Sequence, residues 1–122
     1  MTKRILVVED QEDLRGLLRT LLTGSGYETI EAVDGQAGVA QARAERPDLI
    51  LLDVQMPVLD GYEATRRIKA DPDLAATPVI AVSSFAMKGD EEKARAAGCD
   101  HYVTKPDSPM QLLRVVRAYL GE

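Results

Sequence analysis

The sequence alternates short apolar runs with longer amphipathic stretches, and it does so five times. Three of the runs are apolar at every position: Ile5–Val8, Leu49–Leu52 and Val79–Val82. Such short runs, rich in branched side chains, are typical of strands that are buried on both faces of a sheet. The run Tyr27–Ala32 instead alternates along its length and His101–Thr104 is short, so we expect both to be edge strands.

The stretches between these runs carry helical signals. We predict helices from about Leu14 to Gly24, Gly35 to Glu45, Asp60–Gly61 to Asp71, Gly89 to Ala97, and from Ser108–Pro109 onward. Five leucines in the first stretch follow the spacing of one helix face. The last helix is expected to bury Leu112, Leu113, Val116, Tyr119 and Leu120.

Strict alternation of strand and helix predicts an α/β protein with a parallel sheet covered by helices on both faces. Three central strands, two edge strands and right-handed crossovers favour the order 2-1-3-4-5, which is the flavodoxin-like (βα)5 arrangement. A chain of 122 residues has room for one core, so we expect one domain over residues 1–122. Ligands bind such sheets at the carboxyl ends of the strands where the order reverses, here between the first and third strands.

Composition narrows the classes of function. Twenty acidic residues against 15 basic ones give a net charge of −5, which argues against a nucleic-acid surface. No apolar run approaches the ~20 residues of a membrane helix, and the start of the chain does not resemble a signal peptide, so we expect a cytoplasmic protein without membrane insertion. One cysteine, Cys99, cannot form an internal disulfide.

Three acidic residues follow two neighbouring strands at the predicted ligand site. Glu9 and Asp10 end the first strand, and Asp53 ends the third. Each alone could be a loop residue or a helix cap. Three like charges in one small volume favour a bound cation, and oxygen ligands suit Mg²⁺.

The other strand ends add groups that match this chemistry. Ser83 and Ser84 follow the fourth strand, and Lys105 follows the fifth, although Lys105 could also be an ordinary ion-pair partner. Acids, a metal, a hydroxyl and a lysine are together what phosphoryl transfer requires, because the transferred group carries negative charge. A carboxylate can act as the nucleophile and form an acyl phosphate.

At this point the sequence resembles response-regulator receiver domains of two-component signalling over essentially its whole length. The motifs are ILVVED at 5–10, DLILLDVQMPVLDG at 48–61, PVIAVSS at 78–84 and VTKP ending at Pro106. Residues 85–100 are similar to single-domain regulators of the cell-cycle and chemotaxis type and to receivers of hybrid kinases. Met1 and the end soon after Leu120 favour a complete regulator over a receiver from a longer protein.

The resemblance implies that Asp53 accepts a phosphoryl group from a phosphohistidine. It also implies that Asp10 and Asp53 bind Mg²⁺ directly, that Glu9 assists through water, and that the backbone carbonyl of Gln55 completes the protein ligands. Glu9 stands where the family more often has Asp, so the geometry of the metal site is open to change.

The resemblance further implies that Lys105 contacts the phosphoryl oxygens and that Ser83 moves to hydrogen-bond them. Tyr102 then swings inward as the second switch residue. Gln55 and Phe85 occupy positions that tune the rate of self-dephosphorylation. Ser83 replaces the commoner Thr, and Ser84, next to it, replaces the usual Ala.

The resemblance implies a histidine kinase or histidine phosphotransfer protein as phosphodonor and a downstream protein target. We expect the donor to dock near Gln11 and Leu14, because this face borders Asp53. We expect phosphorylation to reshape the face made by the fourth helix, fifth strand and fifth helix, because the fourth helix follows the strand of Ser83, and the target to bind there. The chain is expected to be a monomer or a phosphorylation-dependent dimer. It is expected to be a signalling domain and not an enzyme, although it would phosphorylate itself from small donors and dephosphorylate slowly.

Three other functions fit the sequence less well. A phosphatase with an Asp nucleophile needs a second Asp two residues later, where this chain has Gln55. A flavodoxin-like FMN binder needs a phosphate-cradling loop after the first strand, where the acids at 9–13 would repel phosphate. A degenerate receiver that binds partners without phosphorylation is disfavoured by the intact Asp10, Asp53 and Lys105.

Overall fold

The computed structural model describes residues 2–54, 59–83, 89–104 and 109–121. Along these residues five strands alternate with five helices. Their bounds are β1 (Arg4–Val8), α1 (Glu12–Gly24), β2 (Glu28–Ala32), α2 (Gly35–Glu45), β3 (Leu49–Asp53), α3 (Gly61–Ala70), β4 (Val79–Ser83), α4 (Asp90–Ala97), β5 (His101–Thr104) and α5 (Pro109–Leu120).

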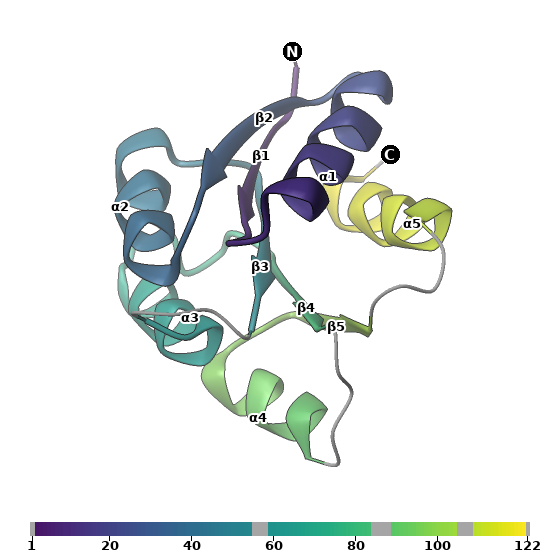
Figure 1. The fold of residues 1–122 in the computed structure, drawn as a ribbon. Coiled ribbons are helices and arrows are strands. Elements are labelled where there is room, and N and C mark those ends of the chain that lie inside the picture. The colour runs from purple at the N-terminus through teal and green to yellow at the C-terminus, as the bar shows by residue number, and fades with distance from the viewer. Residues whose placement is uncertain (1, 55–58, 84–88, 105–108, 122) are drawn as a thin grey trace.

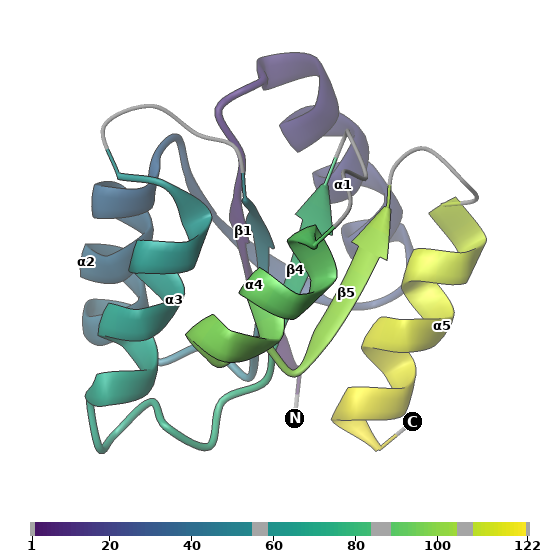
Figure 2. The ribbon, with the colours of Figure 1, turned by 90° about the horizontal axis from the view of Figure 1, so that it is seen from below.

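The five strands form one parallel sheet in the order β2-β1-β3-β4-β5. The predicted fold class and strand order are therefore confirmed. Figures 1 and 2 show α1 and α5 on one face of the sheet and α2, α3 and α4 on the other. The positions of the two edge strands are confirmed as well: β1, β3 and β4 are almost completely buried, whereas β2 and β5 are mostly half-buried.

Alternation along the strands divides the core between the two faces. Ile5 and Val7 of β1 pack with α1 and α5, in a cluster that also holds Leu18, Leu22, Leu112 and Val116. Leu6 and Val8 pack with α2, α3 and α4, in a cluster that also holds Val39, Ala42, Ala64, Ile68 and Ala94. Each fully buried aliphatic side chain contributes about 1.5–3 kcal/mol, so the central strands dominate the stability of the fold.

Helix α4 has much less apolar anchoring than α5. It buries the two small side chains of Ala94 and Ala97, together with Asp90. Helix α5 buries Leu112 and Leu113 along with Val116. At about 0.8 kcal/mol for each buried methylene, the apolar burial of α4 is worth a fraction of that of α5. Helix α4 can therefore shift at a low energetic cost.

Among the described helical residues, three large apolar side chains are exposed: Leu17, Met110 and Tyr119. Tyr119 was expected to be buried, but it is 38% exposed, and that prediction was wrong. Its ring lies across the edge strand against His101, with ring centroids 5.8 Å apart, and its hydroxyl donates to the carbonyl of Asp100 at 2.8 Å. Leu17 of α1 is 53% exposed because the stripe of five leucines is wider than the surface that α1 covers.

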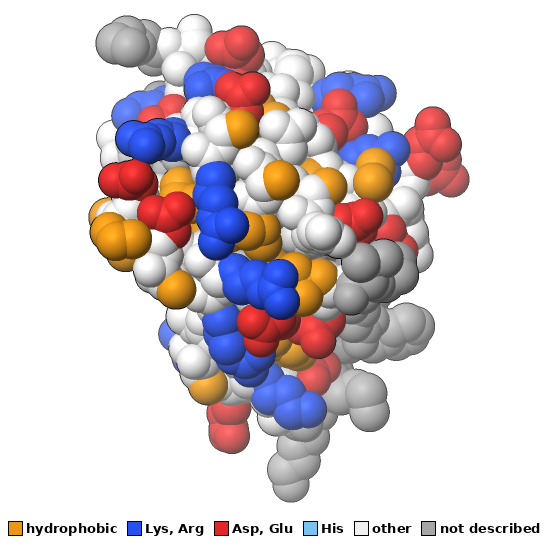
Figure 3. Space-filling model, turned by 90° about the vertical axis from the view of Figure 1, so that its left-hand side faces the viewer, with side chains coloured by type: hydrophobic (Ala, Val, Ile, Leu, Met, Phe, Trp, Pro, Cys, Tyr) orange, Lys and Arg blue, Asp and Glu red, His pale blue; other side chains and the backbone are white. Residues whose placement is uncertain are grey.

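Basic side chains gather in a band on the side of the molecule formed by α2 and α3 (Figure 3). Each of the exposed arginines there lies beside an acid: Arg43 with Asp71, Arg46 with Asp73, and Arg66 and Arg67 with Glu63. Exposed pairs of this kind contribute ~0–1 kcal/mol. The band therefore forms a salt-bridged, solvated face. Within the described residues, no helix is both long and apolar enough to cross a membrane.

Glycine permits α2 to pack directly on β1. A Cβ at Gly38 would lie 2.9 Å from both γ-methyls of Val8, which is itself 1% exposed. We expect Gly38→Ala to lower the free energy of unfolding by about 1–3 kcal/mol, because an overpacked core must shift. Gly24→Ala is the control, since no atom lies within 4 Å of its Cβ position. Urea denaturation of both variants measures this, and equal stabilities would contradict the packing argument.

Candidate functional site

Three carboxylates meet at the carboxyl ends of β1 and β3. The two strands are neighbours, with Val8 paired to Leu52, so the residues that follow β1 lie beside the end of β3. One carboxylate oxygen from each of Glu9, Asp10 and Asp53 lies within 4.8 Å of the others. Glu9 and Asp53 are 1% and 5% exposed, and Asp10 is exposed. The site therefore has a buried floor and one side that is open to solvent.

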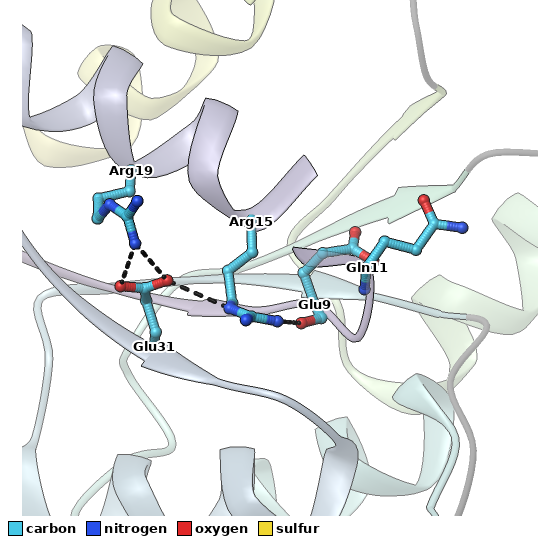
Figure 4. Close-up of polar contacts among 5 residues, drawn as sticks. All are labelled: Glu9, Gln11, Arg15, Arg19 and Glu31. Carbon is cyan, nitrogen blue, oxygen red and sulfur yellow. Dashed lines mark hydrogen bonds and ion pairs between the residues drawn. The ribbon is translucent and has the colours of Figure 1, made fainter. Parts of the chain in front are cut away.

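The backbone and side chain of Glu9 are held by several hydrogen bonds, part of which Figure 4 shows. Its N–H donates to the carbonyl of Ala32 in β2 at 3.0 Å. Its carbonyl accepts from Nη1 of Arg15 at 2.9 Å, and its carboxylate accepts from the N–H of Gln11 at 3.2 Å. Arg15 in turn lies 3.2 Å from the carboxylate of Glu31. The turn after β1 is thus fixed by β2 and α1.

Helix α3 begins directly against the peptide of Asp53. A Cβ at Gly61 would lie 2.4 Å from the carbonyl oxygen of Asp53, so only glycine fits there. The N–H of Gly61 donates to the carbonyl of Val54 at 3.2 Å, and Asp60 caps the helix by accepting from the N–H of Glu63 at 2.9 Å. The pair Asp60–Gly61 predicts the start of this helix, but its contact with the end of β3 depends on tertiary packing and has no local signal in the sequence.

The predicted switch residues lie on neighbouring strands. Ser83 ends β4, is fully buried, and pairs with Thr104 of β5. Tyr102 of β5 pairs with Ala81 and packs against the core on the α2, α3 and α4 side. Its hydroxyl is buried and has no hydrogen-bond partner among the residues that the structure describes. A buried hydroxyl without a partner costs about 1–3 kcal/mol, and the packing of the ring against the core cluster offsets this cost.

Four of the residues singled out in the sequence lie outside the described residues. They are Gln55, Ser84, Phe85 and Lys105. The structure therefore places the acids, Ser83 and Tyr102 of the predicted site, and the roles assigned to these four residues remain predictions.

A second group of polar residues lies between α3, α4 and β5. Thr65 donates to the carbonyl of Gly61 at 2.7 Å and lies 3.5 Å from the sulfur of Cys99, and both side chains are buried. Burial raises the pKa of the Cys99 thiol. Asp90 of α4 is 9% exposed. This burial arises because α4 packs against α3.

Tyr62 of α3 packs against the same core cluster as Tyr102 and interacts electrostatically with Asp90. The pKa of Tyr62 is raised to about 12, mainly by burial and further by the negative charge of Asp90. The causes are physically distinct: burial removes water from the phenolate, and the carboxylate repels it. The pKa of Tyr62 is therefore coupled to α4 through Asp90 and, to a smaller extent, to β5 through Tyr102.

The arrangement of the three acids suits a hard divalent cation. All the ligand atoms are oxygens, they converge within one small volume, and the open side at Asp10 leaves room for water. Mg²⁺ is bound in this way, by a few carboxylates with water in the remaining positions. Without a cation the ionised carboxylates would repel one another. A parallel α/β sheet with such a centre at its switch point is suited to phosphoryl transfer, because ligands bind such sheets there and a divalent cation offsets the charge of the transferred group.

Comparison with known proteins places the chain in a family. The family model of the response regulator receiver domain matches residues 5–117, and the chain therefore belongs to this family. It is 46% identical to the polar-differentiation response regulator DivK of Brucella ovis, over 100% of this chain and 99% of the relative. Its function is accordingly that of a receiver domain in two-component signalling, of the kind found in single-domain response regulators.

Solved structures agree with this assignment. The receiver domain of a sensor histidine kinase from Pseudomonas aeruginosa, which has a magnesium ion in its active site cleft, superposes with a TM-score of 0.92 at 35% identity, covering 100% of both chains. The chemotaxis protein CheY4 of Vibrio cholerae superposes with a TM-score of 0.92 at 27% identity, covering 98% of this chain and 99% of that one.

The titration of Tyr62 tests the described packing of α3 against α4 near Asp90. Its pKa is raised from the ordinary 10.0 to about 12, so the folded state keeps the proton where the unfolded state loses it. The contribution of Tyr62 to stability is therefore present below pH 10 and is lost as the pH rises toward 12. Ultraviolet difference absorbance of the phenolate, with Tyr62→Phe subtracted, measures this.

Asp90→Asn should lower the midpoint of the Tyr62 titration in part, because burial is the larger cause of the shift. Asp73→Asn, an exposed acid on the loop after α3, is the control and should not change it. A Tyr62 midpoint near 10 in the unmodified protein would contradict the described packing of α3 against α4.

Proposed function

We propose that Asp53 accepts a phosphoryl group from a phosphohistidine of a histidine kinase or a histidine phosphotransfer protein. The observation that carries the proposal is the convergence of Asp53 with Glu9 and Asp10 within 4.8 Å at the switch point of the sheet. A carboxylate oxygen of Asp53 forms a bond to phosphorus while the bond from phosphorus to the histidine nitrogen breaks. The products are an acyl phosphate on Asp53 and an unmodified histidine.

Mg²⁺ is the proposed cofactor, and Glu9, Asp10 and Asp53 are the residues that would hold it. We propose that Asp10 and Asp53 act as direct ligands, that Glu9 acts through water, and that the carbonyl of Gln55 adds a further ligand. The bound cation supplies positive charge that offsets the charge on the oxygens of the transferred group. The chain itself contributes the fixed geometry, through the hydrogen bonds of Glu9 and the packing of Gly61 against the Asp53 peptide.

Lys105 is proposed to contact the phosphoryl oxygens as a fixed cation, and Ser83 to donate a hydrogen bond to them. Gln55 and Phe85 are proposed to tune the lifetime of the acyl phosphate. The chain would also take a phosphoryl group from small donors in the presence of Mg²⁺ and lose it slowly to water. It is thus proposed to be a signalling domain that promotes its own phosphorylation and dephosphorylation. A cytoplasmic location stays a prediction.

The output is proposed to pass through Ser83 and Tyr102 to the face made by α4, β5 and α5. Ser83 is fully buried, so a shift of its hydroxyl toward the phosphoryl group leaves space that neighbouring side chains must refill. Tyr102 lies one strand away with an unpartnered hydroxyl among the described residues, and α4 has little apolar anchoring. These features support a small energy gap between two positions of this face.

The phosphodonor is proposed to dock on α1, which begins two residues after Asp10. Leu17 is 53% exposed and Leu14 is half-buried on this helix, which gives an apolar contact surface next to the acids. A receiver that acts without phosphorylation is less favoured, because such a module has no need of three converging carboxylates.

Phosphorylation of Asp53 is tested by intact-mass measurement after incubation with acetyl phosphate and Mg²⁺. We expect one acid-stable, base-labile phosphoryl group on the unmodified protein and none after Asp53→Asn or with EDTA present, because the nucleophile or the cation is then absent. Asp73→Asn, at an acid 60% exposed and remote from the site in sequence, is the matched control and should be modified normally. Addition to Asp53→Asn would place the acceptor elsewhere.

The switch is tested by amide chemical shifts recorded with and without phosphorylation. We expect shifts over α4, β5 and α5 in the unmodified protein and smaller ones in Ser83→Ala, because the hydroxyl that links the phosphoryl group to β4 is removed. Unchanged spectra on phosphorylation would rule out this output face.

The free energy of unfolding of Tyr102→Phe should be equal to or above that of the unmodified protein, since the deleted hydroxyl has no described partner.

A further inference from the structure

Arg15 joins the acidic turn to both β2 and α1. Its Nη1 donates to the carbonyl oxygen of Glu9 at 2.9 Å, and its Nε lies 3.2 Å from Oε1 of Glu31 (Figure 4). The side chain of Arg15 is 16% exposed. The guanidinium is thus largely withdrawn from water, and it divides its donors between a backbone group and a carboxylate.

Glu31 holds this guanidinium in place from the neighbouring strand. Two arginines one helical turn apart on α1 contact its carboxylate: Arg15 at 3.2 Å and Arg19 at 3.2 Å. Glu31 lies on the face of β2 toward α1, whereas the next residue, Ala32, packs into the core on the opposite face. The two arginines stabilise the Glu31 carboxylate on the face of β2 that α1 covers. The same carboxylate orients the planar guanidinium of Arg15.

The bond from Arg15 fixes a particular peptide. The carbonyl of Glu9 belongs to the planar unit that joins Glu9 to Asp10, so fixing this carbonyl fixes the Cα of Asp10, the atom that carries its side chain. The N–H of Glu9 is bonded to Ala32, and the Glu9 carboxylate accepts from the N–H of Gln11. With Arg15 in place, both sides of the Glu9 backbone are held.

We propose that Arg15, oriented by Glu31, is a positioning residue for the metal-binding acids. It holds the peptide between Glu9 and Asp10 so that both carboxylates converge on Asp53. The proposal rests on the proposed function in assuming that these acids bind Mg²⁺. It goes further in assigning the preorganisation of the turn to a residue that has no contact with the acids' ligand oxygens in the described hydrogen bonds.

The direction of the change in Mg²⁺ affinity on substitution of Arg15 separates a positioning role from a purely electrostatic one. A guanidinium near the site repels a second cation, so removal of its charge alone would strengthen Mg²⁺ binding or leave it unchanged. Loss of a positioning contact weakens binding, because the ligands must then be ordered by the metal itself. A residue that only stabilises the fold would change the unfolding transition and not the dissociation constant of the folded protein.

The test is isothermal titration of the unphosphorylated full chain with Mg²⁺ alone, beside thermal unfolding of each variant. We expect Arg15→Met to raise the Mg²⁺ dissociation constant by roughly 10-fold, the lower end of what outer contacts of metal ligands contribute. Glu31→Gln should raise it in the same direction by less. Arg15→Lys should fall between Arg15→Met and the unmodified protein, because an ammonium can reach one of the two partners.

Two arginines serve as matched controls. Arg19→Met removes the same charge from the same carboxylate without a contact to Glu9. Arg4 donates to the carbonyl of Glu45 at 2.8 Å and lies 2.7 Å from its carboxylate, so Arg4→Met removes the same types of contact at the opposite end of β1. Neither variant should raise the dissociation constant.

The outcomes are distinguishable. If the unmodified protein binds Mg²⁺, Asp53→Asn weakens it, and Arg15→Met binds as tightly as before, the positioning role is overturned and the metal site stands. If the unmodified protein does not bind Mg²⁺, the proposed function and this inference both fall. If Arg15→Met does not fold, Arg15→Lys and Glu31→Gln decide, and unchanged binding in both overturns the proposal.

Discussion

The parallel pairing of β1 with β3 is the constraint on which the rest of the structure depends. Their register places Val8 beside Leu52, buries both strands on both faces, and brings the residues that follow them to one point. The same pairing that stabilises the core through apolar burial therefore forces three acidic residues together. Burial on this scale offsets the repulsion among them, and a bound cation would remove it.

The two ends of the site differ in how firmly they are held. On the β1 side, the turn carrying Glu9 is fixed by Ala32 and Arg15, and on the β3 side Gly61 brings α3 against the Asp53 peptide. Helix α4 is anchored mainly by alanines. A rigid acceptor next to a loosely held helix suits a receiver domain, because the chemistry needs fixed ligands and the signal needs an element that moves at a low cost.

Much of this could be predicted from the sequence because it depends on local patterns. Apolar periodicity gave the strands and helices, and chain topology alone brings Glu9, Asp10 and Asp53 to one edge of the sheet. Contacts that depend on how a helix is rotated against a strand could not be predicted. The contact of Arg15 with Glu9, the burial of Asp90 and the exposure of Tyr119 are of this kind. Each is decided by side-chain packing between elements that are distant in sequence.

The direction of the strands has a practical consequence for work with this protein. The chain enters the sheet at the start of β1, and α5 runs back antiparallel to the strands, so both termini lie at the end of the sheet opposite the acids (Figure 2). A fluorescent protein, an affinity tag or a tethering linker attached at either terminus would stand away from Asp53 and from the first turn of α1. Labelled forms of the chain should therefore remain accessible to a phosphodonor during imaging or immobilisation.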